Sequence, residues 1–169
     1  MEIDSSYEDS LIPVEKMHMT LACLGLDDDI EVDQACEFLR DIQPDLEAFR
    51  PKDIEVNFKG VDHFFHNVLY AKITPNEDML KFVNYLRDSV KQAGIEIRDV
   101  FDFTPHMTVL KFKKHHQVMA HTRYIDPKLY EVFANTPFGV QFFNNIHLCK
   151  MTTEADDDGF YVCPKKIKF

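Results

Sequence analysis

Residues 103–112 read Phe-Thr-Pro-His-Met-Thr-Val-Leu-Lys-Phe, and the tripeptide within this stretch, His106-Met107-Thr108, occurs a second time at His18-Met19-Thr20. Apolar residues flank both copies, which is typical of strands. Side chains two positions apart on a strand point to the same face, so each copy would present an imidazole beside a hydroxyl. A single histidine on a strand is usually a core residue, but two matching copies in one short chain favour a shared function.

Two such strands side by side would gather two imidazoles and two hydroxyls around a space that suits one phosphate. One histidine would then act as general base and the other as general acid, without a metal. Threonine hydroxyls would donate hydrogen bonds to non-bridging phosphate oxygens. We therefore predict that His18 and His106 are catalytic, that Thr20 and Thr108 contact phosphate, and that the site uses no metal and no cofactor. The pattern leaves open which histidine is the acid and which is the base.

The hydrophobic pattern outward from the tripeptides predicts an alternation of strands and helices. The expected strands cover residues 17–26, 54–58, 68–73, 95–97, 105–112, 140–149 and 160–169, and the expected helices cover 30–49, 75–93 and 127–133. Asp27-Asp28-Asp29 should cap the first helix, and Pro44 should kink or end it. Thr74, with a proline and a glutamate behind it, predicts a capping box for the second helix, and Gly94 its end.

This order of elements predicts an α+β fold with helices packed outside antiparallel sheets. Residues 1–11 are polar and acidic, and we expect them to form a mobile lead-in. Residues 12–169 contain no linker-like segment and are expected to form a single two-lobed domain.

Composition and charge narrow the range of partners. The chain has 169 residues, of which 45% are hydrophobic, and a net charge of −10. A protein that coats long duplex nucleic acid draws its affinity from Lys and Arg, so that class of partner is not expected. A nucleotide or the end of a short oligonucleotide needs only a few convergent donors and remains compatible with the charge.

The four cysteines lie far apart in the sequence and include no Cys-x-x-Cys pair, which favours reduced thiols. The chain also lacks an apolar stretch of spanning length and a basic leader, so we expect no membrane association and a location in the cytoplasm or nucleus.

Three other features of the sequence bear on the composition of the site. His115, His116 and His121 lack a companion carboxylate or cysteine at ligand spacing, and a solvated loop is the preferred interpretation. Strand alternation puts Lys111 on the face opposite to His106 unless a bulge intervenes. The aromatic run 63–66 contains residues able to stack a base, although aromatic residues near a hairpin are more often core.

The doubled His-Met-Thr, followed each time by an apolar residue, resembles the motif of the 2H phosphoesterase superfamily. Further similarity lies in Phe103-Thr104-Pro105 before the second motif and in the segments 125–131, 146–151 and 159–161. These segments resemble the central domain of A-kinase anchoring protein 7-like proteins. The resemblance runs from about Ile12 to the C-terminus.

The resemblance implies two lobes related by pseudo-twofold symmetry, with a central groove in which each lobe supplies one His-x-Thr. It also implies a metal-independent phosphodiesterase that acts on 2′,5′-linked oligoadenylate, on 2′,3′-cyclic phosphates or on RNA ends, with AMP-like ligands. The alternative is a non-catalytic module that binds a nucleoside monophosphate for regulation, and a third is a protein-interaction scaffold. Anchoring of protein kinase A resides in a helix outside this domain in the family, and this chain gives no support for it.

Overall fold

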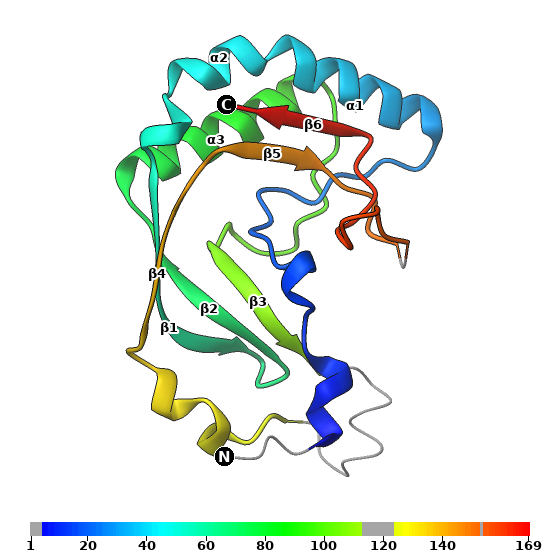
Figure 1. Cartoon of the computed structure of the whole chain (residues 1–169). Coiled ribbons are helices and arrows are strands. Elements are labelled where there is room, and N and C mark those ends of the chain that lie inside the picture. Colours follow the sequence, from blue (N-terminus) through cyan, green and yellow to red (C-terminus); the bar gives the residue numbers. More distant parts are fainter. Residues whose placement is uncertain (1–4, 113–123, 153) are drawn as a thin grey trace. The chain divides into compact units, whose positions relative to one another are not determined.

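A computed structural model describes residues 5–112, 124–152 and 154–169 of the chain (Figure 1). The described residues fall into two compact units. Unit 1 comprises Met1–Met19, Asn57–Thr74 and Pro105–Gly139, and unit 2 comprises Thr20–Val56, Pro75–Thr104 and Val140–Phe169. Each unit is described by itself.

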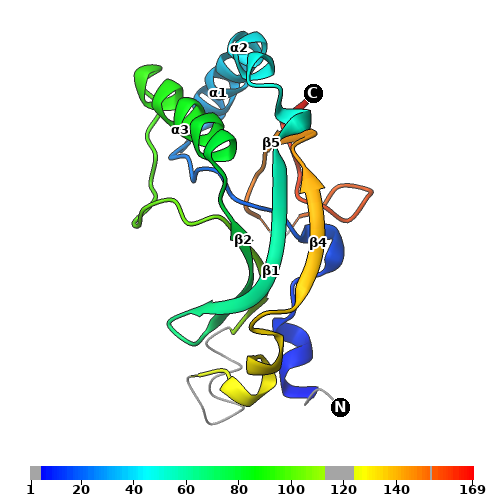
Figure 2. The same ribbon diagram turned by 90° about the vertical axis from the view of Figure 1, so that its left-hand side faces the viewer.

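The larger sheet contains four strands in the order β3-β2-β1-β4. Their bounds are Glu55–Phe64 for β1, Val68–Thr74 for β2, His106–Lys111 for β3 and Pro137–Phe142 for β4. The pairs β1–β2 and β2–β3 are antiparallel, and each contains one register shift. Figure 2 shows β1 between β2 and β4. The hairpin and the strand that carries the second tripeptide are therefore confirmed.

Strand β3 forms an edge of this sheet, and the N-terminal segment lies along it. Leu11 forms a β-bridge with Leu110, and the Ile12 N–H donates to the carbonyl of Val109 at 2.9 Å. Ahead of this contact, Ser5–Ser10 form the 3₁₀ helix η1. Regular structure thus begins before Ile12, where the sequence predicted only a lead-in.

Burial of large side chains explains why η1 packs against the rest of unit 1. Tyr7 stacks on Phe112 with ring centroids 5.4 Å apart. Both belong to a buried cluster completed by Leu110, Ile125 and Tyr130. Removing such aromatic side chains from water is among the largest contributions to folding, so this cluster holds η1, β3 and the segment after residue 124 together. That segment contains two 3₁₀ helices, η4 (Pro127–Leu129) and η5 (Glu131–Phe133), where one short helix was expected.

Unit 2 is built around three α-helices: α1 (Asp29–Asp41), α2 (Gln43–Ala48) and α3 (Glu77–Gln92). The Asp28 side chain caps α1 by accepting from the Glu31 N–H, and α1 ends just before Pro44, which lies in the first turn of α2. Both features confirm the predictions. Phe82 of α3 is fully buried and contacts Phe49, Phe143 and Phe169.

Strands β5 (Asn145–Leu148) and β6 (Lys165–Lys168) form a two-stranded antiparallel sheet in unit 2. Figure 1 shows this pair running beside α1, and Ile167 of β6 is buried there. The two long closing strands predicted from the sequence are thus shorter. The first is divided between β4 and β5, and the second is reduced to β6.

Three predicted details are wrong. Residues 17–26 are not a strand, because within this range only Leu24 forms a β-bridge, with Ile97. Residues 95–97, which were expected to form a strand, contribute only Ile97 to this same bridge. The cap of α3 is Asn76, whose side chain accepts from the Met79 N–H, while Thr74 is the last residue of β2 and pairs with Asn57.

Among the described residues, the longest helices are too short and too polar to cross a bilayer. The segment that contains His115, His116 and His121, for which a solvated loop was the preferred interpretation, lies outside the described residues.

Candidate active site

The second tripeptide lies on β3 as predicted, with His106 and Thr108 two positions apart. The register pairs His106 with Lys72 and Thr108 with Tyr70 on β2. Residues directly opposite each other in an antiparallel pair share a face of the sheet. One face therefore presents an imidazole, an ammonium group and two hydroxyls, and His106 and Thr108 are both half-buried.

Two aromatic rings position His106. The imidazole packs edge-to-face against Phe64 at 5.0 Å and against Tyr70 at 5.3 Å, and the two aromatic rings stack on each other at 4.4 Å. Phe64 comes from the aromatic run 63–66, so this member of the run packs on the candidate catalytic residue. Burial raises the pKa of the Tyr70 phenol, and the nearby carboxylate of Asp62 raises it further. Tyr70 therefore remains a neutral hydrogen-bond donor across the physiological range.

His18 belongs to the same compact unit as His106, although it lies on a loop after the short 3₁₀ helix η2 (Val14–Lys16). Its Nδ1 lies 2.8 Å from the carbonyl oxygen of Lys16. A carbonyl only accepts, so the Nδ1–H donates this bond and fixes the tautomer. In the neutral ring the lone pair is then on Nε2, which is the arrangement that a general base requires.

The chain beyond Thr20 is tied down within unit 2. Arg87 of α3 donates to the Leu21 carbonyl at 2.8 Å and forms an ion pair with Asp99, while the other oxygen of Asp99 accepts from the Cys23 N–H at 3.0 Å. The Arg98 N–H donates to the Cys23 carbonyl. The contacts of Arg87 and Asp99 are made by side chains, whereas the Arg98–Cys23 hydrogen bond belongs to the Leu24–Ile97 bridge, which is the β-pairing that residues 17–26 retain.

Lys111 lies on the His106 face, contrary to the alternation argument. The register shifts between Leu69 and Tyr70, so that β3 has one extra residue there and Lys111 pairs with Val68. Val68 shares its face with Tyr70 and Lys72. The bulge that the sequence argument named as the exception is therefore present.

Sequence reasoning also missed Lys72, Arg87 and Asp99. Lys72 sits in an apolar strand, where a lone lysine is a visible signal. Arg87 and Asp99 carry no local signal, because their importance comes from contacts with a segment more than sixty residues earlier.

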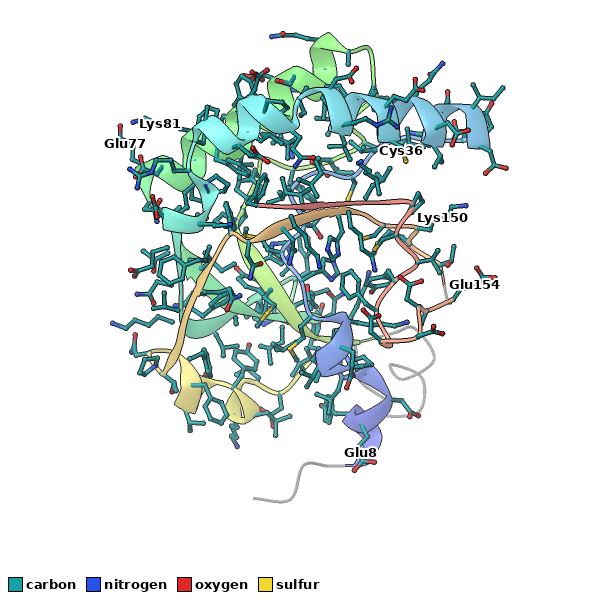
Figure 3. All side chains as sticks on the ribbon, turned by 45° about the horizontal axis from the view of Figure 1, so that its top comes forward. Glu8, Cys36, Glu77, Lys81, Lys150 and Glu154 are labelled. Carbon is teal, nitrogen blue, oxygen red and sulfur yellow. The ribbon has the colours of Figure 1, made fainter. Side chains whose placement is uncertain are left out.

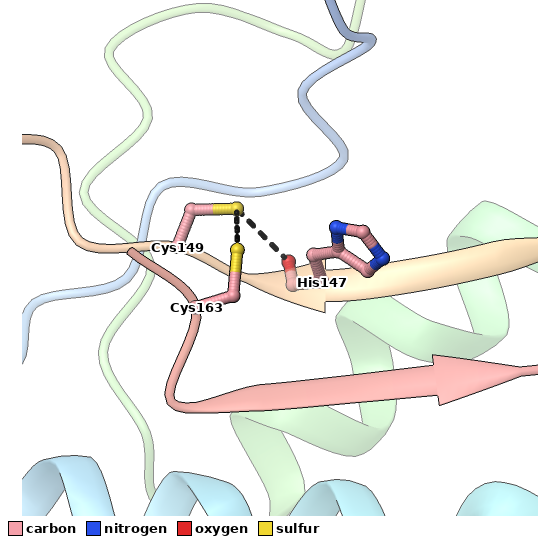
Figure 4. A group of neighbouring side chains, drawn as sticks. All are labelled: His147, Cys149 and Cys163. Atoms are coloured by element: carbon pink, nitrogen blue, oxygen red, sulfur yellow. Dashed lines mark hydrogen bonds between the residues drawn. The ribbon is translucent and has the colours of Figure 1, made fainter. Parts of the chain in front are cut away.

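A second cluster of reactive side chains lies in unit 2. The Sγ atoms of Cys149 and Cys163 are 3.4 Å apart, and the nearest nitrogen of His147 lies within 4.8 Å of both sulfur atoms (Figure 4). Burial raises the pKa of the Cys149 thiol to about 12, with a further contribution from Cys163. Burial and the positive charge of Lys166 lower the pKa of His147. Both cysteines are free thiols, as are Cys23 and Cys36.

Two solved structures share the fold of this chain. The chain matches a crystal structure of E. coli LigT complexed with 3′-AMP, with a TM-score of 0.57 and 13% identity over 96% of this chain and 81% of that one. It also matches a crystal structure of a phosphoesterase, with a TM-score of 0.52 and 15% identity over 94% of this chain and 84% of that one. The α+β fold with its antiparallel sheet is thus a LigT-like fold.

The family follows from the sequence comparison. The model of the AKAP7 2′5′ RNA ligase-like domain matches residues 1–169, so the chain belongs to this family. Human A-kinase anchor protein 7 isoform gamma is 25% identical over 169 residues, which make up 97% of this chain and 49% of that protein. The chain therefore spans about half the length of this curated relative.

Proposed function

We propose that the protein is a metal-independent phosphodiesterase that cleaves 2′,5′-linked oligoadenylate or a related nucleotide or RNA-end phosphodiester. His18 and His106 serve as its general base and general acid, and Thr20 and Thr108 contact the phosphate. The observation that carries the proposal is the shared face of His106, Thr108, Lys72 and Tyr70 on β2 and β3. This face offers hydroxyl donors and a cation that can bind the phosphate of a phosphodiester, and an acid that can protonate the leaving oxygen.

The hydrogen bond from His18 to Lys16 supports the assignment of the two roles. With Nδ1–H donated to the carbonyl, Nε2 of neutral His18 accepts the proton of the attacking water or ribose hydroxyl. The attacking oxygen forms a bond to phosphorus as the bond to the leaving oxygen breaks. His106, as imidazolium, donates its proton to that leaving oxygen. One proton is taken up and one is given, so the pair returns to its starting state through solvent.

The substrate class rests on the family and on a structural relative. The family description names a 2′5′ RNA ligase-like domain, and the LigT structure contains 3′-AMP. The ligand of the LigT structure is an adenine nucleotide with a 3′ phosphate, and the family description names a 2′5′ RNA linkage; together they support the proposed substrate class. Such a ligand agrees with an acidic chain, because one phosphate held by convergent donors needs no extended basic surface.

The experiment that tests the proposal compares three substrates in the presence of EDTA: 2′,5′-oligoadenylate, 3′,5′-oligoadenylate and a 2′,3′-cyclic nucleotide. The unmutated protein should turn over at least one of them. His18→Ala and His106→Ala should each lower kcat/KM by about 10²- to 10⁴-fold, the usual contribution of general acid–base catalysis. His66→Asn is the matched control, since His66 is exposed in the same unit and asparagine tolerates its left-handed backbone (φ 56°).

Two outcomes would overturn the proposal. If no substrate is cleaved while AMP still binds to the unmutated protein and fails to bind to the two alanine variants, the chain is a nucleotide-binding module. If cleavage occurs only with an added divalent metal, in the unmutated protein and in Cys149→Ser alike, the two-histidine mechanism is wrong.

A further inference from the structure

The cluster of His147, Cys149 and Cys163 plays no part in the proposed reaction. All three residues belong to unit 2, at the end of the β5–β6 sheet. His147 and Cys149 are two residues apart on an extended segment, so their side chains project to the same side. Cys163 comes from the opposite segment, which is held there by the hydrogen bond from the Lys150 N–H to the Val162 carbonyl at 2.9 Å.

We infer that His147, Cys149 and Cys163 form a site for a thiophilic divalent cation, with zinc as the best match, and that water completes a tetrahedral coordination. Two thiolates and one imidazole are a known ligand set of zinc. With Zn–S near 2.3 Å and Zn–N near 2.0 Å, a tetrahedral site needs its ligand atoms about 3.5–3.8 Å apart. The two sulfur atoms are 3.4 Å apart, and all three ligand atoms lie within 4.8 Å of one another.

The charge and surroundings of the cluster fit a dication. Two thiolates balance Zn²⁺, so the site needs no carboxylate ligand. The carboxylate of Asp156, which raises the pKa of Cys149, accepts instead from Lys166 at 3.1 Å and so also offsets the positive charge of that lysine. Phe160 packs edge-to-face on His147 at 5.6 Å and restricts the ring.

The arrangement fits a cation better than a structural disulfide. Each thiol donates to a backbone carbonyl, Cys149 to His147 at 3.7 Å and Cys163 to Tyr161 at 3.1 Å. In the metal-free cluster these contacts hold the two thiols as separate groups, and both hydrogen bonds are lost when the cation displaces the thiol protons. Figure 4 shows the Cys149 contacts. A disulfide has no use for the third group, whereas a metal site does. Binding of Zn²⁺ by the reduced cluster displaces the two thiol protons, while His147 enters as a neutral ring and releases none.

The test uses the full chain, reduced and stripped of metal, and titrates it with cobalt(II) and then with zinc. We expect one equivalent of cobalt to give thiolate-to-metal charge-transfer bands and the ligand-field bands of tetrahedral cobalt. One equivalent of zinc should abolish these bands, and a weakly buffered solution should acidify by up to two protons per zinc. These measurements need no variant and therefore do not depend on the folding of one.

Variants then assign the ligands. We expect Cys149→Ser, Cys163→Ser and His147→Gln each to weaken zinc binding at least about tenfold. The comparison uses variants whose circular dichroism spectra match that of the unmutated protein. Cys36→Ser is the matched control, because Cys36 is a partly buried thiol on α1 of the same unit and should leave the cobalt spectrum unchanged (Figure 3).

Three results would overturn the inference. The first is a reduced protein that gives no charge-transfer band with cobalt. The second is a band that survives in both cysteine variants. The third is isolation of Cys149 and Cys163 as a disulfide whose reduced form binds no zinc, which would identify the pair as redox-active. Phosphodiesterase activity in EDTA is a separate measurement, so the failure of this inference does not resemble a failure of the proposed function.

Discussion

Lys72 on β2 lies directly opposite His106 on β3, so an ammonium group and the candidate general acid share one face of the sheet. Lysine is an effective phosphate ligand as a mobile point charge. Thr108 occupies the next position on that face. A phosphate that accepts a hydrogen bond from Thr108 would therefore be within reach of both the Lys72 ammonium group and the His106 imidazole. We therefore expect Lys72 to contribute to substrate binding.

Replacement of Lys72 by methionine, which retains much of the side-chain length without the charge, should raise KM by about tenfold or more. A hydrogen bond to a charged group is worth roughly 1.5–3 kcal/mol. Because the charge acts on the bound phosphate before and during the reaction, kcat should change less than KM. Steady-state kinetics with the preferred substrate measure both, and an unchanged KM would contradict this role.

The control for this charge removal is Lys81→Met. Lys81 forms an exposed i,i+4 pair with Glu77 on α3 at 2.8 Å (Figure 3). Solvent screens such an exposed pair, so its removal should change neither kinetics nor stability measurably.

Tyr70 should make the stability of the protein sensitive to alkaline pH. Its pKa is raised by burial and by Asp62, so the folded state favours the neutral phenol. The stabilising contribution is complete below the unfolded value of about 10 and is lost as the pH rises through the higher folded value. Urea unfolding at pH 9 and pH 11 measures the effect. The free energy of unfolding should fall less between these two pH values in Tyr70→Phe than in the unmutated protein. Equal losses would mean that the folded phenol ionises normally.

The ion pair between Arg87 and Asp99 should support the loop that contains Thr20. The two side chains are only 14% and 19% exposed, and both also hold backbone groups of residues 21–23. Arg87→Met or Asp99→Asn should cost about 1–3 kcal/mol, less than for a fully buried pair. Both should also lower kcat/KM. A double-mutant cycle by urea unfolding measures the coupling, and additive effects would show that the residues act separately.

Gly60 should tolerate no side chain. A Cβ there would lie well inside contact distance of the Ala134 carbonyl oxygen, and φ is +78°. The Gly60 N–H also donates to Thr136 at 2.8 Å, so the backbone cannot withdraw. Gly60→Ala should cost more than about 3 kcal/mol. Gly94→Ala is the matched control, because its φ is also +78° but, in the described part of the chain apart from its two neighbours, no atom would lie within 4 Å of an added Cβ. Its cost should stay at about 1–2 kcal/mol.

Local sequence signals predicted most of the elements. The break between α1 and α2 at Pro44, the cap at Asp28, the β1–β2 hairpin and β3 with its tripeptide all depend on neighbours in the chain. For these, backbone chemistry and hydrophobic period suffice.

Features that depend on distant partners were missed or misplaced. The segment after Met17 has a strand-like composition, yet its backbone is held by Arg87 and Asp99. The face of the sheet on which Lys111 lies depends on a bulge in β3 opposite Leu69. A register shift of one residue moves every later side chain of the strand to the other face. Thr74 has the pattern of a helix cap but is used by the ladder of β2.

The cluster of Cys149 and Cys163 shows the same limit. The sequence indicated two closing strands, but it carried no information on the register that places the thiols together. A motif is visible in sequence when its ligands are local, and these ligands are not.

The pH dependence of kcat/KM in EDTA, measured for the unmutated protein and for His18→Ala and His106→Ala, tests the central claim most directly. The account predicts a bell between about pH 5 and pH 8 for the unmutated protein. Loss of the base in His18→Ala should remove the acidic limb, and loss of the acid in His106→Ala should remove the alkaline limb, each with a large fall in rate. A bell that persists unchanged in either variant would contradict the paired roles of the two histidines.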